Sequence, residues 1–83
     1  MPRFHFHIQE NGRFIEDEEG QEFHDWDQVR REAVATGTSI ARDAFVNGTA
    51  RQVTVHVNRD GSPFMKVSIS LDVEDQPVPS AEA

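Results

Sequence analysis

Residues 3 to 9 alternate between apolar and polar side chains, and this alternation constrains the fold more than any other feature. Phe4, Phe6 and Ile8 fall on one face of an extended segment, while His5 and His7 fall on the other. Such alternation is typical of a strand that is buried on one face only. The pattern returns in residues 51–56 and 64–73, so three segments need a cover over their apolar face.

One amphipathic helix is predicted over residues 25–47 to supply that cover. Asp25 is a suitable N-cap, Gln28 completes a capping-box pattern, and Asn47-Gly48 can close the helix in the left-handed conformation. Apolar or small side chains recur at three- and four-residue steps. Gly37 costs up to about 1 kcal/mol relative to alanine inside a helix. We therefore expect close approach of the sheet at Gly37, through strand side chains such as the phenylalanines.

Turn sequences divide the strand segments into two hairpins. Asn11-Gly12 is a preferred type I′ turn because both residues tolerate positive φ. This turn pairs Ile8 with Ile15, and the second strand is expected to be short because residues 16–20 show no apolar alternation. Residues 58–63 are dense in turn formers and predict the second hairpin.

Together these segments predict an α+β domain over residues 1–73 in ββαββ order. Its sheet is mostly antiparallel and four-stranded, with one helix packed on one face. Residues 74–83, with prolines and acids and little to bury, are expected to form a disordered tail. The predicted core consists of the inward-facing side chains Phe4, Phe6, Ile8, Ile15, Trp26, Val29, Ala33, Ile40, Ala44, Val53, Val55, Val57, Val67, Ile69 and Leu71.

The acidic surplus is concentrated in one stretch. The chain carries 15 acids, 8 bases and a net charge of −7, and seven of the acids lie in 16–27, which has no Lys or Arg. This balance disfavours a nucleic-acid backbone as partner, because phosphate contacts need clustered Lys and Arg. We interpret the stretch as a solvated connection, with a basic partner or a divalent cation as alternatives.

Several protein classes are disfavoured by what the sequence lacks. There is no cysteine, so a disulfide, a thiolate metal site and a thiol nucleophile are unavailable. No segment approaches the roughly 18 apolar residues of a membrane span, and no secretory leader is recognised, so we expect a soluble cytoplasmic protein. No Gly-rich phosphate loop, nucleophile elbow or His-Glu-x-x-His helix occurs. We therefore expect a protein that is not an enzyme and uses no cofactor.

Three histidines are the best-defined candidates for a metal site. Strand parity places His5, His7 and His56 on the sheet face opposite the helix. Residues two apart on a strand lie about 7 Å apart at the backbone. Two imidazoles could therefore reach one metal ion, with His56 as a third ligand from an adjacent strand. The alternative is that they are ordinary amphipathic side chains on a solvated face.

The same face is predicted to carry an interaction surface. Aromatics exposed among small hydroxyl side chains could recognise a protein partner or form the seam of a homodimer. The alternative is an uninformative solvent face. RNA stacking is not expected, because basic residues near the aromatics are few. A homodimer is slightly favoured, since a small core leaves little stability and four strands leave two free edges. The residues assigned to this surface are Phe14, Thr54, Phe64, Lys66 and Ser68, with Ser70 beside them.

The sequence also resembles a known family. Members of a family of short bacterial domains of unknown function, common in rhizobia and related alphaproteobacteria, begin with a Pro-Arg-aromatic-Phe-His segment and continue with an Asp-Glu-Glu-Gly turn. This chain is similar in Met1-Pro2-Arg3-Phe4-His5-Phe6-His7-Ile8 and in Asp17-Glu18-Glu19-Gly20. The resemblance covers about residues 1–72 and implies no assigned activity, catalytic residue or cofactor. His5 stands where an aromatic is more usual, which counts against a family metal site there.

These observations predict a small non-enzymatic binding or regulatory module that acts through protein–protein contacts. One alternative is a metal-binding protein that uses the strand-face histidines. Another is a regulator similar to the HicB-like antitoxin domains, which share a short β-segment leading into an Ala-rich helix. Those domains normally have a longer three-stranded sheet before the helix and are often paired with a DNA-binding segment, which is not recognised here.

Overall fold

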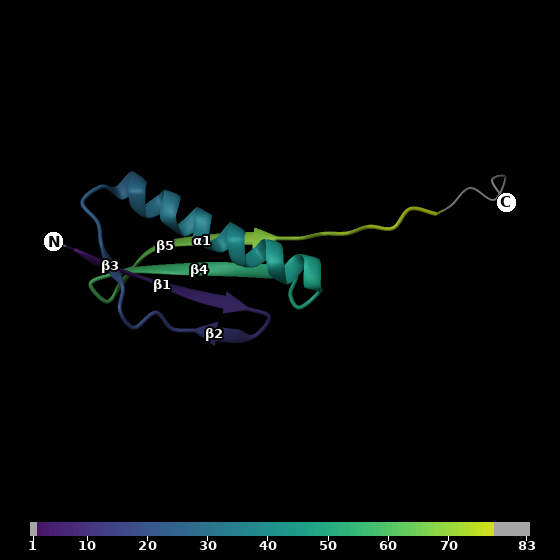
Figure 1. Cartoon of the computed structure of the whole chain (residues 1–83), viewed down its shortest axis with the longest axis horizontal. Coiled ribbons are helices and arrows are strands. Elements are labelled where there is room, and N and C mark those ends of the chain that lie inside the picture. Colours follow the sequence, from purple (N-terminus) through teal and green to yellow (C-terminus); the bar gives the residue numbers. More distant parts are fainter. Residues whose placement is uncertain (1, 78–83) are drawn as a thin grey trace.

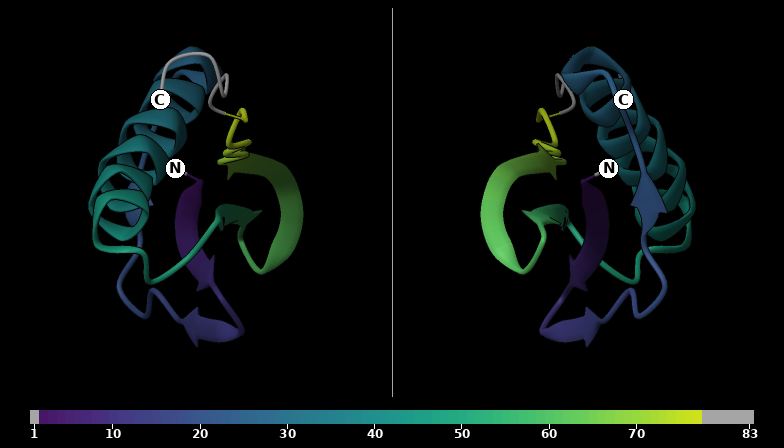
Figure 2. Two further views of the ribbon diagram at one scale, coloured as in Figure 1. Left: turned by 90° about the vertical axis from the view of Figure 1, so that its right-hand side faces the viewer. Right: turned by 90° about the vertical axis from the view of Figure 1, so that its left-hand side faces the viewer.

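The structure is a computed structural model that describes residues 2–77. One helix lies along one face of an antiparallel sheet (Figures 1 and 2). The α+β fold with a single covering helix is therefore confirmed. In chain order the elements are β1 (Arg3–Glu10), β2 (Arg13–Ile15), β3 (Gln21–Glu22), α1 (Trp26–Asn47), β4 (Gln52–Arg59) and β5 (Ser62–Ser70).

The sheet has the strand order β2-β1-β4-β5, and β3 also pairs with β1. Because β4 occupies one edge of β1, both β2 and β3 must lie along the other edge. The predicted register of Ile8 opposite Ile15 is confirmed. The prediction of four strands omitted β3, because its two residues are too few to show an alternation.

The second hairpin turns more tightly than predicted. β4 reaches Arg59 and β5 begins at Ser62, so only Asp60-Gly61 forms the turn, with φ of 49° and 87°. The expectation of a loop over 58–63 was wrong, because two residues that accept positive φ suffice for a type I′ turn. The register shifts between Val57 and Asn58, which marks a β-bulge in this hairpin.

The helix begins and ends at the predicted residues. The Asp25 side chain accepts a hydrogen bond from the N–H of Asp27 at 2.9 Å, and Gly48 adopts φ 73° in the C-cap. Among the described residues, the Gln28 side chain accepts no hydrogen bond from the N–H of Asp25, so the predicted capping box is not completed. A single carboxylate on the second helical N–H is enough to cap the end.

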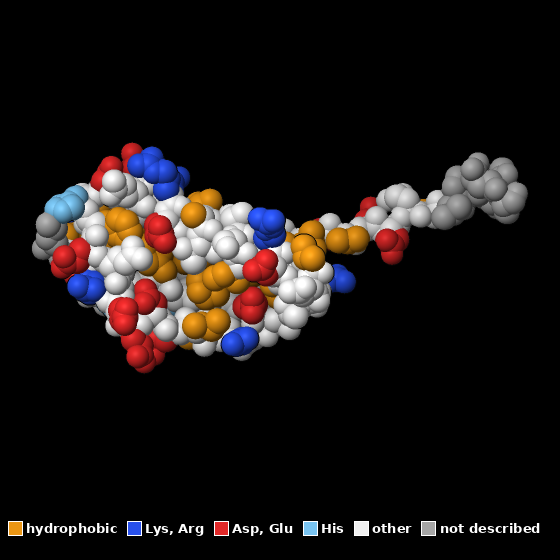
Figure 3. All heavy atoms as spheres, in the orientation of Figure 1, with side chains coloured by type: hydrophobic (Ala, Val, Ile, Leu, Met, Phe, Trp, Pro, Cys, Tyr) orange, Lys and Arg blue, Asp and Glu red, His pale blue; other side chains and the backbone are white. Residues whose placement is uncertain are grey.

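The core lies between α1 and the centre of the sheet. Most of the predicted core is buried, Ile40, Val67 and Ile69 are half-buried against it, and Ala41 and Ala50 join it. Ile15, Trp26 and Leu71 were wrongly placed in it, since they are 42 %, 44 % and 37 % exposed. A single helix is too narrow to cover all the strands, so apolar side chains remain visible between α1 and the strands beside it (Figure 3).

Residues 71–77 run away from the sheet and form no helix or strand (Figure 1). The rest of the predicted tail, residues 78–83, lies outside the described part of the chain. Within the described part, no helix has the length and apolar character needed to cross a membrane.

Gly37 marks a very close approach of α1 to the sheet. A Cβ atom on this residue would lie 2.9 Å from Cδ1 of Ile69 and 3.0 Å from Cγ2 of Val55. The predicted close approach at Gly37 is confirmed, although the contacts are aliphatic side chains rather than phenylalanines. The absence of a Cβ therefore fixes how near the helix can sit to β4 and β5.

The substitution Gly37→Ala is expected to lower the free energy of unfolding. Alanine gains about 1 kcal/mol of helix propensity, but overpacking a close contact costs about 1–3 kcal/mol. We therefore expect a net loss of up to about 2 kcal/mol in urea unfolding. The exposed Ser39→Ala is the control and should gain about 0.5 kcal/mol. A gain in Gly37→Ala equal to that of the control would contradict the close contact.

Candidate binding surface on the outer face of the sheet

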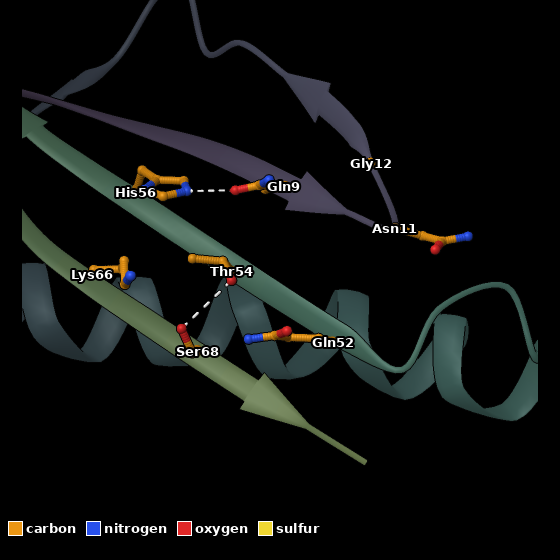
Figure 4. Close-up of a pocket in the computed structure, with 8 residues that line it drawn as sticks. All are labelled: Gln9, Asn11, Gly12, Gln52, Thr54, His56, Lys66 and Ser68. Carbon is orange, nitrogen blue, oxygen red and sulfur yellow. Dashed lines mark hydrogen bonds between the residues drawn. The ribbon is translucent and has the colours of Figure 1, made fainter. Parts of the chain in front are cut away.

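The outer face, defined as the side of the sheet opposite α1, is polar where the inner face is apolar. In Figure 4 the strands stand in front of the helix, and polar side chains from β1, β4 and β5 project toward the viewer. Strand alternation produces this face directly, because each residue next to a buried valine or phenylalanine must point outward. It carries Gln9, Gln52, Thr54, His56, Lys66 and Ser68.

A groove of about 310 Å³ runs over these side chains, and Asn11 and Gly12 close one end of it (Figure 4). Two cross-strand hydrogen bonds order its floor. His56 Nε2 lies 2.9 Å from Gln9 Oε1, and the hydroxyls of Thr54 and Ser68 lie 3.5 Å apart. Lys66 and Ser68 are therefore exposed in the predicted surface, whereas Thr54 lines the groove but is only 8 % exposed. The groove can satisfy polar groups of a ligand through amide, hydroxyl and ammonium groups.

A row of rings borders the groove on the β1 side. The imidazoles of His5 and His7 stack with centroids 6.1 Å apart. Phe14 on β2 lies 5.7 Å from His7 and 6.2 Å from His56. Phe14 is 58 % exposed, as predicted for the outer face. The row therefore joins three strands into one flat, amphipathic strip.

Phe64 does not belong to this surface, so that assignment was wrong. Its ring packs edge-on against Phe4 at 5.2 Å and Trp26 at 5.8 Å, on the helix side of the sheet. Phe64 is the extra residue of the bulge, since Met65 pairs with Val57 while Pro63 pairs with Asn58. A bulge interrupts strict alternation, which is why parity gave the wrong face.

The three histidines share the outer face, but they do not converge. His7 lies opposite His56 in the register, as the predicted adjacency required. However, His7 Nδ1 accepts a hydrogen bond from the N–H of Asp17 at 3.0 Å, and His56 is bonded to Gln9. Within residues 2–77, no three His, Asp or Glu side chains are arranged to hold one ion.

The loop between β2 and β3 is built around Asp17, whose role the sequence analysis missed. Its Oδ2 accepts from the N–H of Phe6 at 3.0 Å, and its Oδ1 accepts from the N–H of Gly20 at 3.1 Å. Phe6 lies between the parts of β1 that pair with β2 and β3. The carboxylate thus occupies the position of a missing strand partner. The available signal was the Asp-x-x-Gly spacing, typical of a turn.

Gly20 and Arg3 hold the same loop against β1. Gly20 has φ 72°, and a Cβ there would lie 2.8 Å from the carbonyl oxygen of Phe4. Arg3 donates through Nη1 to the carbonyl of Glu19 at 2.6 Å. The predicted solvated connection is therefore an ordered edge of the sheet at this point. Beside it lies a second hollow of about 360 Å³, lined by His5, His7, Glu16, Asp17, Glu18, Asn58 and Gly61.

The Asp17 carboxyl is held in its ionised form. Partial burial acts to raise its pKa, but hydrogen bonds from the backbone N–H groups of Phe6, Gly20 and Glu19 lower it. The nearby His5 lowers it further. The hydrogen bonds and His5 together outweigh the partial burial, so the pKa of Asp17 lies below its ordinary value.

Comparison with known proteins gives one match. The model of a domain of unknown function, DUF6894, matches residues 3–70. No curated protein and no solved structure matches the chain.

Replacing Asp17 should destabilise the fold in a pH-dependent way. Asp17→Ala removes the charged acceptor of the hydrogen bonds from Phe6 and Gly20, which should lower the free energy of unfolding by about 1–3 kcal/mol at pH 7. A lowered folded-state pKa gives stability that is present above the unfolded pKa of about 3.9 and is lost as the pH falls through the folded value.

Denaturant unfolding from pH 7 to acid measures this difference. The difference in free energy of unfolding between wild type and Asp17→Ala should become smaller below about pH 4. Glu18→Ala, an exposed neighbouring acid, is the matched control and should change stability little at any pH. A difference that stays constant from pH 7 to acid would show that the charge of the carboxylate contributes nothing to the free energy of unfolding.

Proposed function

The chain belongs to the DUF6894 family, and we propose that it is a non-enzymatic module that binds a protein partner through the outer face of its sheet. The observation that carries this proposal is the exposed Phe14 ring set between His7 and His56. Aromatic side chains supply much of the binding energy at protein interfaces, because they bury a large area at small entropic cost.

The surroundings of Phe14 suit a protein partner better than a small molecule. Polar side chains line the groove beside it, whereas small-molecule sites are lined mostly by apolar and aromatic side chains. The exposed Gln9, Gln52 and Ser68 offer hydrogen-bonding groups around the aromatic strip. An aromatic anchor with a polar rim is the usual arrangement at a protein interface.

The charges at the two ends of the ring row indicate how a bound partner would be oriented. Glu16 and Glu18 line the hollow at one end of the ring row, and Lys66 lines the groove at the other. A partner with basic side chains near the Asp17 loop and an acidic one near Lys66 would match both ends. Such complementarity sets orientation and association rate more than affinity.

The proposal that the chain is not an enzyme is supported by the state of the Asp17 carboxyl. Its pKa is lowered, which favours the ionised form. Its oxygens already accept hydrogen bonds from Phe6 and Gly20, which gives them a structural task. A general acid or base at neutral pH would need the opposite displacement.

Affinity capture from cells with matched surface variants tests the proposal. Phe14→Ser should abolish capture of the partner and leave the fold intact, because the ring is largely exposed. Val46→Ser removes an 81 % exposed apolar side chain from α1, on the other side of the molecule, and is the control. The proposal predicts that wild type and Val46→Ser capture the same protein. Equal capture by a folded Phe14→Ser would contradict it.

The second candidate function, metal binding, is favoured only by the shared face of His5, His7 and His56. Two of these imidazoles already take part in hydrogen bonds. We therefore expect no stoichiometric zinc in protein purified without an affinity tag. Bound zinc that is lost in His7→Ala and kept in His24→Ala would support the metal function instead.

A further inference from the structure

The outer edge of β5 has no partner strand among the described residues. β5 ends the strand order with nine residues, whereas the opposite edge consists of the short strands β2 and β3 with the Asp17 loop between them. An edge of this kind presents unpaired backbone N–H and C=O groups, which can pair with another strand. The two edges of the sheet therefore differ in the length of strand that is open to pairing.

The hydrogen bond at the end of β5 identifies the unpaired groups. Leu71 donates its N–H to the carbonyl of Arg51 at 2.9 Å, so Leu71 directs its backbone groups toward β4. Backbone direction alternates along an antiparallel pair. Val67 and Ile69 therefore also face β4, while the backbone groups of Lys66, Ser68 and Ser70 face away from the sheet. The bulge precedes Met65 and does not disturb this stretch.

We propose that β5 of a second copy of this chain pairs antiparallel with this edge, with the twofold axis at Ser68. Ser68 then lies opposite Ser68 of the second copy, and Lys66 lies opposite its Ser70. All outward-facing backbone groups of these three residues become paired. An axis at Val67 would leave Ser70 unpaired, and an axis at Lys66 would set two ammonium groups opposite each other.

The side chains of β5 fit the same register. On the helix side, Val67 meets Ile69 of the second copy and Met65 meets its Leu71. Met65, Val67 and Ile69 are half-buried, and Leu71 is more exposed, so this row still has apolar area to bury. Val34, an exposed apolar residue of α1, adds to the apolar surface of the monomer.

β5 carries three features that usually protect an edge. Pro63 and the bulge at Phe64 precede the segment that would pair, and Lys66 lies within it. The Lys66 side chain lies over the groove on the outer face and does not extend along the edge (Figure 4). In the proposed register it is diagonal to Asp72 of the second copy, which gives it an opposite charge. Six positions separate Lys66 from Asp72 along an extended chain, so the two cannot meet within one molecule.

Pairing at this edge would also enlarge the outer face. The two sheets become continuous, and the two grooves that Lys66 and Ser68 line face the same side on either side of the axis. This inference stands apart from the proposed partner surface at Phe14. Phe14 lies on β2, at the far edge of the sheet from β5.

Sedimentation of edge variants tests the pairing. We expect wild type to form dimers with a dissociation constant on the order of 10 µM, as for small, partly polar interfaces. Ser68→Pro removes the outward N–H from both copies and should weaken the dimer at least about tenfold. Ser68→Ala loses the same hydroxyl but keeps the N–H, so it should sediment like wild type. Phe14→Ser should leave the dimer unchanged.

Cysteine cross-linking tests the register and does not depend on whether Ser68→Pro folds. The chain has no cysteine, so one substitution introduces one thiol. Ser68→Cys places two thiols on directly opposed residues, about 5.5 Å apart at Cα, which a disulfide can bridge. Ser70→Cys faces Lys66 of the second copy and should cross-link poorly. Wild type that stays monomeric at about 1 mM, or equal cross-linking of both variants, would overturn the proposal.

Discussion

Much of this structure depends on one constraint, the covering of a whole sheet by a single helix. α1 can approach β4 and β5 closely because Gly37 has no Cβ, and that approach buries the central valines of β4 completely. The width of one helix does not reach every strand. Ile15 on β2 and Leu71 beyond β5 therefore stay partly exposed. The opposite face receives no cover among the described residues, and most of its side chains are polar, with the exposed Phe14 as an exception.

The Asp17 loop provides a hydrogen-bond acceptor for a backbone group of β1 that no neighbouring strand reaches. Phe6 directs its side chain into the core and its N–H toward the edge of β1, where neither β2 nor β3 reaches it. A backbone donor left without a partner would cost about 1–3 kcal/mol. The Asp17 carboxylate accepts this hydrogen bond, and the N–H of Asp17 fixes the His7 ring in turn. The loop thus connects the core to the ring row on the outer face.

The sequence predicted the parts of the fold that follow from periodicity and turn chemistry. Phe4, Phe6 and Ile8 had to share a face, and Asn11-Gly12 set the pairing of Ile8 with Ile15. Periodicity failed at Phe64, because a single inserted residue reverses the face and leaves no mark in the pattern. The role of Asp17 was equally hidden. The Asp17 carboxylate takes the place of a strand partner only because β2 ends before Phe6 and β3 begins beyond it. No local sequence pattern specifies where these two short strands end.

The two proposed surfaces differ in how much of each could be read from the sequence. The Phe14 surface follows from alternation and from the turn at Asn11-Gly12. Phe14, Lys66 and Ser68 lie on the face predicted for them, whereas Phe64 was wrongly included and Gln9 and Gln52 were not predicted. The β5 edge depends on which residues direct their backbone groups outward. That direction is fixed by the hydrogen bond from Leu71 to Arg51 and by the position of the bulge. The side-chain pattern does not show where the bulge lies, so it could not identify which residues of β5 face away from β4.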